Sequence, residues 1–129
     1  MKYKTYAILV MALIPAVSNS SEAQCLAGIM HSESSGESIE GLIAVAQASI
    51  NRSIATKRPI CLIRGVTRKK PPQNIAKHYI ALAQSILDGG VSIVGKADSW
   101  ERSRRPKYAC KITRRIEHHT FYVMKGLHN

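Results

Sequence analysis

The sequence predicts a single small domain of the α+β class that is mainly α-helical. Three stretches, at residues 24–32, 38–52 and 73–88, carry apolar side chains at helical spacing. A run of strand-forming residues, Thr-Phe-Tyr-Val-Met at 120–124, lies near the C-terminus. With 129 residues, the chain is long enough for one hydrophobic core and too short for two domains.

The first 23 residues have the pattern of a secretory signal peptide. Lys2 and Lys4 give a positive start, residues 7–17 form an apolar run, and Ser21 and Ala23 place small side chains before a cleavage point at Gln24. The apolar run is shorter than the roughly 20 residues that a membrane-spanning helix needs. We therefore expect export to the periplasm or the extracellular space, with residues 24–129 as the functional domain and no stable membrane insertion after cleavage. An uncleaved N-terminal anchor is the alternative.

Each predicted helix has its own boundary signals. The first, at 24–32, is followed by Ser-Ser-Gly at 34–36, where Gly36 suits a left-handed stop. The second begins at Ser38, a residue type that caps helix N-termini, and runs to about Arg52. The third, at 73–88, is ended by Gly-Gly. The apolar stripes are Leu26, Ile29 and Met30 in the first helix, Ile39, Ile43, Ala46 and Ile50 in the second, and Ile75, Tyr79, Leu82 and Ile86 in the third.

The remaining segments carry weaker signals. Residues 53–72 hold three prolines and are expected to be irregular. Residues 97–100 and 120–124 are predicted as short strands that supply a small β-hairpin. The segment between them, 102–115, is a basic stretch in which no strand is predicted; it suits long-range attraction to an anionic partner, and a solvated loop is the alternative.

The charge and the cysteines limit the environment of the protein. The chain has 19 Lys and Arg against 8 Asp and Glu, a formal net charge of +11 at pH 7. Such an excess indicates an anionic partner. In an oxidising compartment, any two of Cys25, Cys61 and Cys110 can form a disulfide, and we favour Cys61–Cys110.

Few carboxylates are available for chemistry in so basic a chain. Glu33 is the best placed of them, because it ends an apolar helix just before Ser-Ser-Gly, where a cleft can form. A general acid must hold its proton near neutral pH, which requires partial burial. The alternative for Glu33 is an exposed side chain at a helix end.

The stretch from Cys25 to Arg52 resembles the SleB-type cell wall hydrolases. That family shows Cys-Leu-Ala, then Glu-Ala-Arg-Gly-Glu, then Glu-Gly-Gln-x-Ala-Val-Ala-Gln, then Asn-Arg. This chain has Cys-Leu-Ala at 25–27, Glu-Ser-Ser-Gly-Glu at 33–37, Glu-Gly-Leu-Ile-Ala-Val-Ala-Gln at 40–47 and Asn-Arg at 51–52, with the same spacing. Two later segments are similar in order: Ala-Asp-Ser-Trp at 97–100 matches Ala-Thr-His-Phe, and His-Thr-Phe-Tyr at 119–122 matches His-x-Phe-Tyr.

The resemblance implies a lysozyme-like domain that cleaves the glycan strands of peptidoglycan. Glu33 matches the catalytic glutamate of the family, and Glu37 the second glutamate, which we expect to orient the loop and to cap the next helix. By the same matching, the candidate substrate-binding residues are Glu37, Ser99, Trp100, His119 and Tyr122. The chain departs from the family at Ser34-Ser35, which replaces Ala-Arg, and at Asp98-Ser99, which replaces Thr-His.

The chemistry expected from this resemblance is that of a lytic transglycosylase. Glu33 would act as general acid and then general base on the bond between N-acetylmuramic acid and N-acetylglucosamine. One alternative is a hydrolytic muramidase with Asp98 as second carboxylate. Another is a non-catalytic basic module that binds the cell wall or nucleic acid.

We expect no cofactor and no metal. The pattern His31-x-Glu33 followed by Cys61 lacks the second cysteine of zinc deaminases, and His118, His119 and Cys110 lack regular ligand spacing. The expected partner is peptidoglycan, with no nucleic acid, and the protein is expected to be a monomer. A second partner, a protein of the cell-envelope machinery, is compatible with this prediction.

Overall fold

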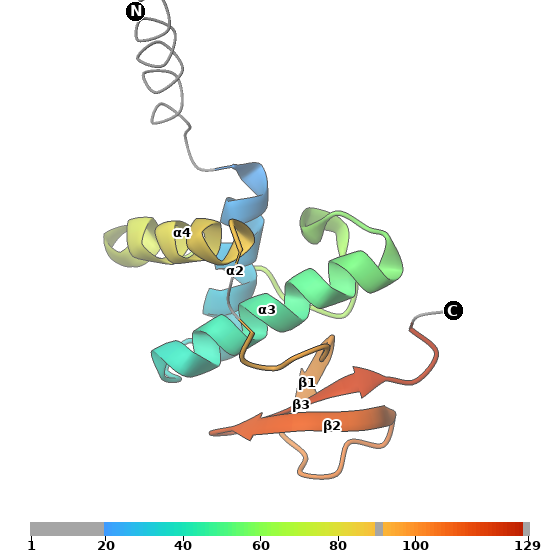
Figure 1. Cartoon of the computed structure of the whole chain (residues 1–129). Helices are drawn as coiled ribbons and strands as arrows, with labels where there is room; N and C mark the ends of the chain where they lie inside the picture. Colours follow the sequence, from blue (N-terminus) through green and yellow to red (C-terminus); the bar gives the residue numbers. More distant parts are fainter. Residues whose placement is uncertain (1–19, 90–91, 128–129) are drawn as a thin grey trace, which may run out of the picture.

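The computed structural model describes residues 20–89 and 92–127, and these form a small α+β domain that is mainly helical, as predicted (Figure 1). About 47% of the described residues are helical and 16% are in strands. Within the described residues, no helix is long and apolar enough to cross a membrane. In chain order the elements are α2 (Ser21–Ser34), α3 (Ile39–Thr56), the 3₁₀-helix η2 (Ile60–Leu62), α4 (Gln73–Leu87), β1 (Ser99–Glu101), β2 (Ala109–Ile116) and β3 (His119–Met124).

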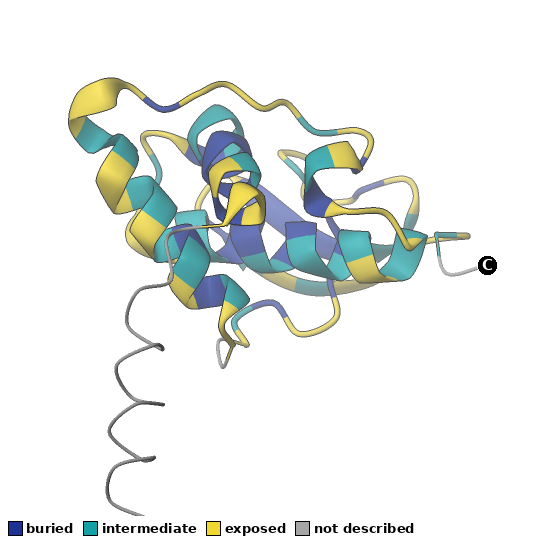
Figure 2. Cartoon of the chain, turned by 90° about the horizontal axis from the view of Figure 1, so that it is seen from above, coloured by how far each residue is buried: buried dark blue, intermediate teal, exposed yellow. Residues whose placement is uncertain are grey.

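Helix α3 lies at the centre of the fold, with α2 and α4 on one side and the sheet on the other (Figure 1). The buried residues, dark blue in Figure 2, gather where these layers meet. They include Leu26, Ile29 and Met30 of α2 and Phe121 of β3, all at 0% exposure. These three α2 residues are the stripe that the sequence predicts, so burial of this face fixes α2 against α3 and α4.

The described part of α2 begins three residues before the predicted helix, inside the segment predicted as a signal peptide. Ser20 is its N-cap, and the Ser20 Oγ accepts a hydrogen bond from the amide of Ala23 at 3.2 Å. The same hydroxyl donates to Gln84 Oε1 of α4 at 3.1 Å, and Ala23 is fully buried. Residues 20–23 therefore belong to the folded domain.

We predict that a chain beginning at Gln24 is less stable than one beginning at Ser20. Removal of residues 20–23 deletes the N-cap and the buried methyl group of Ala23, which together stabilise the fold by roughly 1–3 kcal/mol. Urea unfolding of the two purified chains measures the difference. A matched chain that keeps residues 20–23 but carries Lys77→Ala on the exposed face of α4 serves as control. Equal stability of the chains beginning at 20 and 24 would contradict this account of the N-terminus.

Helices α3 and α4 agree closely with the prediction. Ser38 caps α3, with its Oγ accepting from the amide of Gly41 at 3.2 Å. The helix continues four residues beyond Arg52, to Thr56, and stops where Lys57 adopts a left-handed φ of 55°. Helix α4 ends at Leu87 rather than Asp88.

The sheet has three antiparallel strands in the order β1-β3-β2, one more than predicted. No strand is predicted over 102–115, and the alternative of a solvated loop is wrong for residues 109–116, which form β2, the partner of β3 in a hairpin. Its Lys and Arg side chains lie on the exposed face of an edge strand, where charge protects against pairing with other chains. Arg114, for example, forms an ion pair with Glu40 of α3 at 2.6 Å.

The disulfide joins Cys25 and Cys61, so the prediction of Cys61–Cys110 is wrong. Cys25 lies in α2 and Cys61 in η2, and the bond ties the irregular segment after α3 to the first helix. Cys110 is a free, exposed cysteine on β2. The pairing follows from the packing of η2 on α2, a contact between distant residues that spacing does not encode.

Candidate functional site

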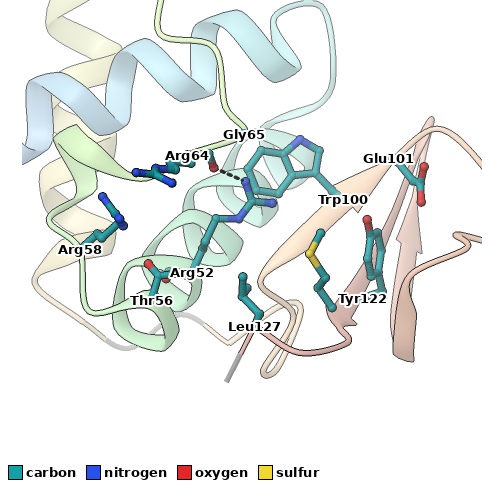
Figure 3. Close-up of a pocket in the computed structure, with 10 residues that line it drawn as sticks. Arg52, Thr56, Arg58, Arg64, Gly65, Trp100, Glu101, Tyr122 and Leu127 are labelled. Carbon is teal, nitrogen blue, oxygen red and sulfur yellow. Dashed lines mark hydrogen bonds between the residues drawn. The ribbon is translucent and has the colours of Figure 1, made fainter. Parts of the chain in front are cut away.

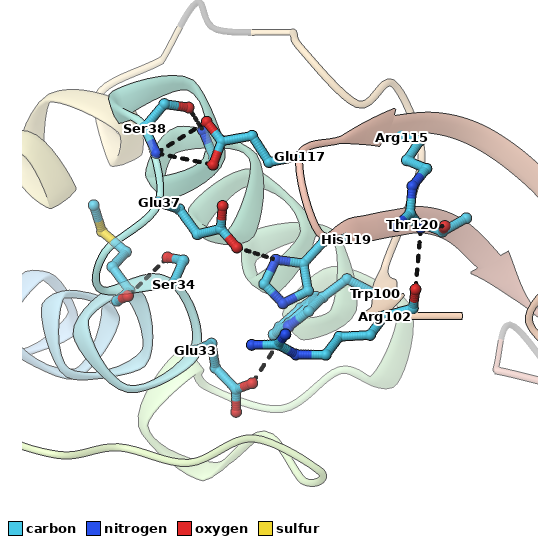
Figure 4. A network of polar contacts seen from close by, with 12 residues as sticks. Glu33, Ser34, Glu37, Ser38, Trp100, Arg102, Arg115, Glu117, His119 and Thr120 are labelled. Carbon is cyan, nitrogen blue, oxygen red and sulfur yellow. Dashed lines mark hydrogen bonds and ion pairs between the residues drawn. The ribbon is translucent and has the colours of Figure 1, made fainter. Parts of the chain in front are cut away.

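Glu33 lies in the last turn of α2, half-buried and facing the sheet (Figure 4). Its Oε1 accepts a hydrogen bond from the backbone amide of Thr67 at 2.8 Å. Its Oε2 lies 3.4 Å from Nε1 of Trp100 on β1. The chain then turns away at Gly36, which has a left-handed φ of 88°. The carboxyl group is thus held by two donors from distant segments rather than pointing freely into solvent.

Trp100 connects Glu33 to Arg52 of α3. The guanidinium of Arg52 lies 4.9 Å from the centre of the indole ring, in cation–π contact. Its Nε and Nη1 donate to the carbonyls of Asp98 at 2.8 Å and Arg64 at 2.9 Å, so Arg52 ties α3 to β1 and to the following loop. Arg52 thereby positions Trp100, and Trp100 in turn contacts the carboxyl group of Glu33.

A second carboxyl group, that of Glu37, lies next to His119 (Figure 4). Its side chain is only 7% exposed, and Oε1 lies 3.7 Å from Nδ1 of His119. A hydrogen bond to the carboxyl group of Glu117, then burial and the Glu117 charge, raise the pKa of Glu37. Glu117 also accepts from the amide of Ser38 at 3.2 Å, which links the β2–β3 turn to the start of α3. Ser38, and not Glu37 as predicted, caps α3. Glu37 instead joins the loop after α2 to the sheet through His119.

His119 begins β3 and is 6% exposed. Burial, and next the positive charge of Arg102, lower its pKa. Its ring packs against Phe121 at 6.2 Å in an edge-to-face arrangement. Figure 4 draws Arg102 extending across Trp100 towards Glu33. The basic segment thus supplies a cation beside the site, although Ser35 replaces the arginine of the family motif.

The lowered pKa of His119 predicts a pH dependence of stability. The unfolded chain binds a proton at this histidine near pH 6.5, whereas the folded chain resists it, so stability is fully present above that pH and falls as the pH drops below it. His119→Gln removes this part of the pH dependence of the free energy of unfolding, measured by urea titration between about pH 5 and 8. His118→Gln, at the exposed neighbour in the turn, is the matched control and keeps it. Identical pH profiles for wild type and His119→Gln would refute the role of burial.

Ser99 and Asp98 lie inside the molecule, which removes Ser99 as a predicted substrate contact and Asp98 as the second carboxylate of the hydrolytic alternative. Both side chains are 0% exposed. Asp98 Oδ1 accepts from the amide of Met124 and from Ser99 Oγ, each at 3.0 Å, and Ser99 Oγ accepts from Arg52 Nη2 at 3.4 Å. Ser99 as a substrate-binding residue is therefore corrected to a buried support for Arg52. Asp98 has the same supporting position and does not face a cleft.

A pocket of about 490 Å³ opens beside Trp100 (Figure 3), and Glu33 is not among the residues that line it. Tyr122 of β3 lines it, as do Trp100 and Glu101 of β1. Burial, and then the charge of Glu101, raise the pKa of Tyr122, so its hydroxyl stays protonated and can donate. Of the predicted substrate-binding residues, Trp100 and Tyr122 line this pocket. Glu37 and His119 do not line it and pair with each other instead.

Several site residues have no counterpart in the prediction. Thr67 acts through its backbone amide, which every residue except proline possesses, so no sequence signal marks it. Arg58 and Arg64 line the pocket from the irregular segment after α3. Their clustering with Pro59 and Gly65 in a segment lacking helical periodicity is the one signal that could have indicated a functional loop.

The site was also considered as a metal centre and compared with known proteins. Among the described residues, no three His, Cys, Asp or Glu side chains are grouped so that they could hold a metal ion. No protein-family model, no curated protein and no solved structure matches this chain. The site is therefore interpreted from its own geometry and from the sequence motifs.

Proposed function

We propose that this protein is an exported enzyme that cleaves the glycan strands of peptidoglycan, with Glu33 as its general acid and base. The observation that carries the proposal is the position of the Glu33 carboxyl group, which accepts from the Thr67 amide and contacts the Trp100 indole, a ring that also lines an aromatic pocket. The similarity of residues 25–52 to the SleB-type hydrolases supports the same residue. Aromatic walls beside a carboxylic acid suit a sugar polymer, because sugar rings stack on indole and phenol rings.

In the proposed reaction Glu33 first donates its proton to the oxygen that links N-acetylmuramic acid to N-acetylglucosamine. The C–O bond to the muramic carbon breaks, and the 6-hydroxyl of the same muramic residue attacks that carbon. The ionised Glu33 then takes the hydroxyl proton, which restores the acid and leaves a 1,6-anhydro end. Only one carboxyl group is needed, and this agrees with the buried position of Asp98.

The hydrolytic alternative requires a second carboxylate on the opposite face of the sugar. Asp98 cannot supply it from its buried position. The Glu37 side chain is also buried, with His119 and Glu117 as neighbours. The transglycosylase route is therefore the better supported of the two.

The test is release of glycan from purified peptidoglycan. The protein spanning residues 20–129 should release soluble sugar fragments from isolated cell wall sacculi, resolved by chromatography. Tight binding to sacculi without release would favour a non-catalytic wall-binding module. Binding to DNA with no effect on sacculi would favour the nucleic-acid alternative, which the exposed basic residues of β2 otherwise recommend.

A further inference from the structure

The pocket beside Trp100 combines an apolar floor with charges of opposite sign at its two sides. Trp100, Tyr122, Met124 and Leu127 supply the apolar surface. Arg58 and Arg64 approach from the segment after α3, and Glu101 stands on the far side, next to Tyr122 (Figure 3). An occupant with small apolar groups, anionic at one end and cationic at the other, would match this arrangement.

The two arginines are available for a ligand. Both are exposed, and neither forms an ion pair with a carboxylate of the described residues. Arg52, by contrast, is 8% exposed and its guanidinium nitrogens bond to Asp98, Arg64 and Ser99. Arg52 therefore holds the pocket wall in place, while Arg58 and Arg64 can pair with carboxylates.

The backbone at Gly65 brings this cationic wall close to Trp100. Gly65 has a left-handed φ of 77°, and a Cβ atom there would lie 3.2 Å from Arg52 Nη1. Because Gly65 has no side chain, the loop can lie against Arg52. The Nη1 of Arg52 donates a hydrogen bond to the Arg64 carbonyl in this loop. Trp100 thus lines the pocket and also contacts the Glu33 carboxyl group.

We propose that this pocket binds the peptide stem of peptidoglycan, the short acidic peptide attached to the muramic residue. Its carboxylates would pair with Arg58 and Arg64, its alanine methyl groups would lie on the apolar floor, and the ammonium group of its diamino acid would face Glu101. This assignment rests on the proposed function, since it places the stem beside the sugar on which Glu33 acts. A neutral sugar alone would make no use of the positive charge that Arg58 and Arg64 bring to one side of the pocket.

The test is equilibrium binding of a synthetic stem peptide with free carboxylates and a free side-chain ammonium group, followed by NMR shifts and calorimetry. The peptide should shift the indole resonance of Trp100. The double variant Arg58→Gln/Arg64→Gln should weaken binding roughly tenfold or more, because two charge-assisted hydrogen bonds are lost. The matched control Lys77→Gln/Lys107→Gln removes the same charge from exposed positions elsewhere and should bind within about twofold of wild type. Glu101→Gln should weaken binding of this peptide. It should leave unchanged the binding of a peptide whose side-chain amine is acetylated, because that peptide has no ammonium group for Glu101.

Unchanged binding by the arginine variant would overturn the proposal, as would equal displacement of the peptide by inorganic phosphate, which would indicate a general anion site. The outcome is distinguishable from that for the proposed function. If the protein cleaves glycan with stems and glycan stripped of stems at the same KM, the stem pocket is wrong and the Glu33 assignment stands. If no glycan is cleaved but the peptide binds through Arg58 and Arg64, the reverse holds.

Discussion

Glu33→Gln should lose glycan cleavage almost completely while keeping its fold. The amide cannot donate or take up the proton that bond breaking requires, and removal of general acid–base catalysis costs about 10³-fold in kcat. The glutamine oxygen can still accept the hydrogen bond from the Thr67 amide, so the turn after α2 is preserved. Release of soluble sugar from sacculi over time measures the effect.

The matched control is Glu40→Gln, which neutralises an exposed glutamate on α3 whose partner is Arg114. It should retain cleavage within about twofold, because a surface ion pair contributes at most about 1 kcal/mol to stability and none to the chemistry. Thermal unfolding of both variants checks that each is folded. Cleavage by Glu33→Gln at the rate of Glu40→Gln would assign the acid to another residue.

Cys25→Ser should cause the largest loss of stability. The disulfide closes a loop with a sequence separation of 36 residues. A crosslink over such a loop limits the entropy of the unfolded chain and stabilises the fold by about 4 kcal/mol in the chain-entropy model. The free energy of unfolding in urea, compared with wild type under oxidising conditions, gives the value.

Cys110→Ser is the matched control, since Cys110 is exposed and free, and its unfolding curve should coincide with that of wild type. A stability loss at Cys110 together with none at Cys25 would restore the Cys61–Cys110 pairing that the sequence favours. Loss of the disulfide should also reduce cleavage, because η2 and the loop that carries Thr67 would be released from α2.

Local signals account for what could be predicted of the fold. The capping role of Ser38 could be predicted because capping involves only residues within one turn. The buried stripe of α2 could be predicted because the buried positions of a helix face repeat every three to four residues. Strand β2 carries no such signal. It is an edge strand whose outer face is solvated, so Lys and Arg occupy positions that would be apolar in a covered strand.

The site divides in the same way. Glu33 could be singled out because it ends a predicted helix just before Gly36, and Trp100 and Tyr122 because they fall in segments that resemble the family's motifs. The burial of Asp98 and Ser99 could not be predicted, because it depends on how β1, β3 and Arg52 meet. The Thr67 amide and the two arginines of the pocket wall are likewise brought to Glu33 and Trp100 by tertiary packing alone.

Mass spectrometry of the fragments released from purified peptidoglycan tests the central claim most directly. Catalysis by one carboxyl group with attack by the muramic 6-hydroxyl predicts glycan fragments that end in 1,6-anhydro-N-acetylmuramic acid, each one water lighter than its hydrolysed counterpart, and none of them with Glu33→Gln. Fragments with ordinary reducing ends, cuts confined to the peptide stems, or intact glycan after full digestion would contradict it.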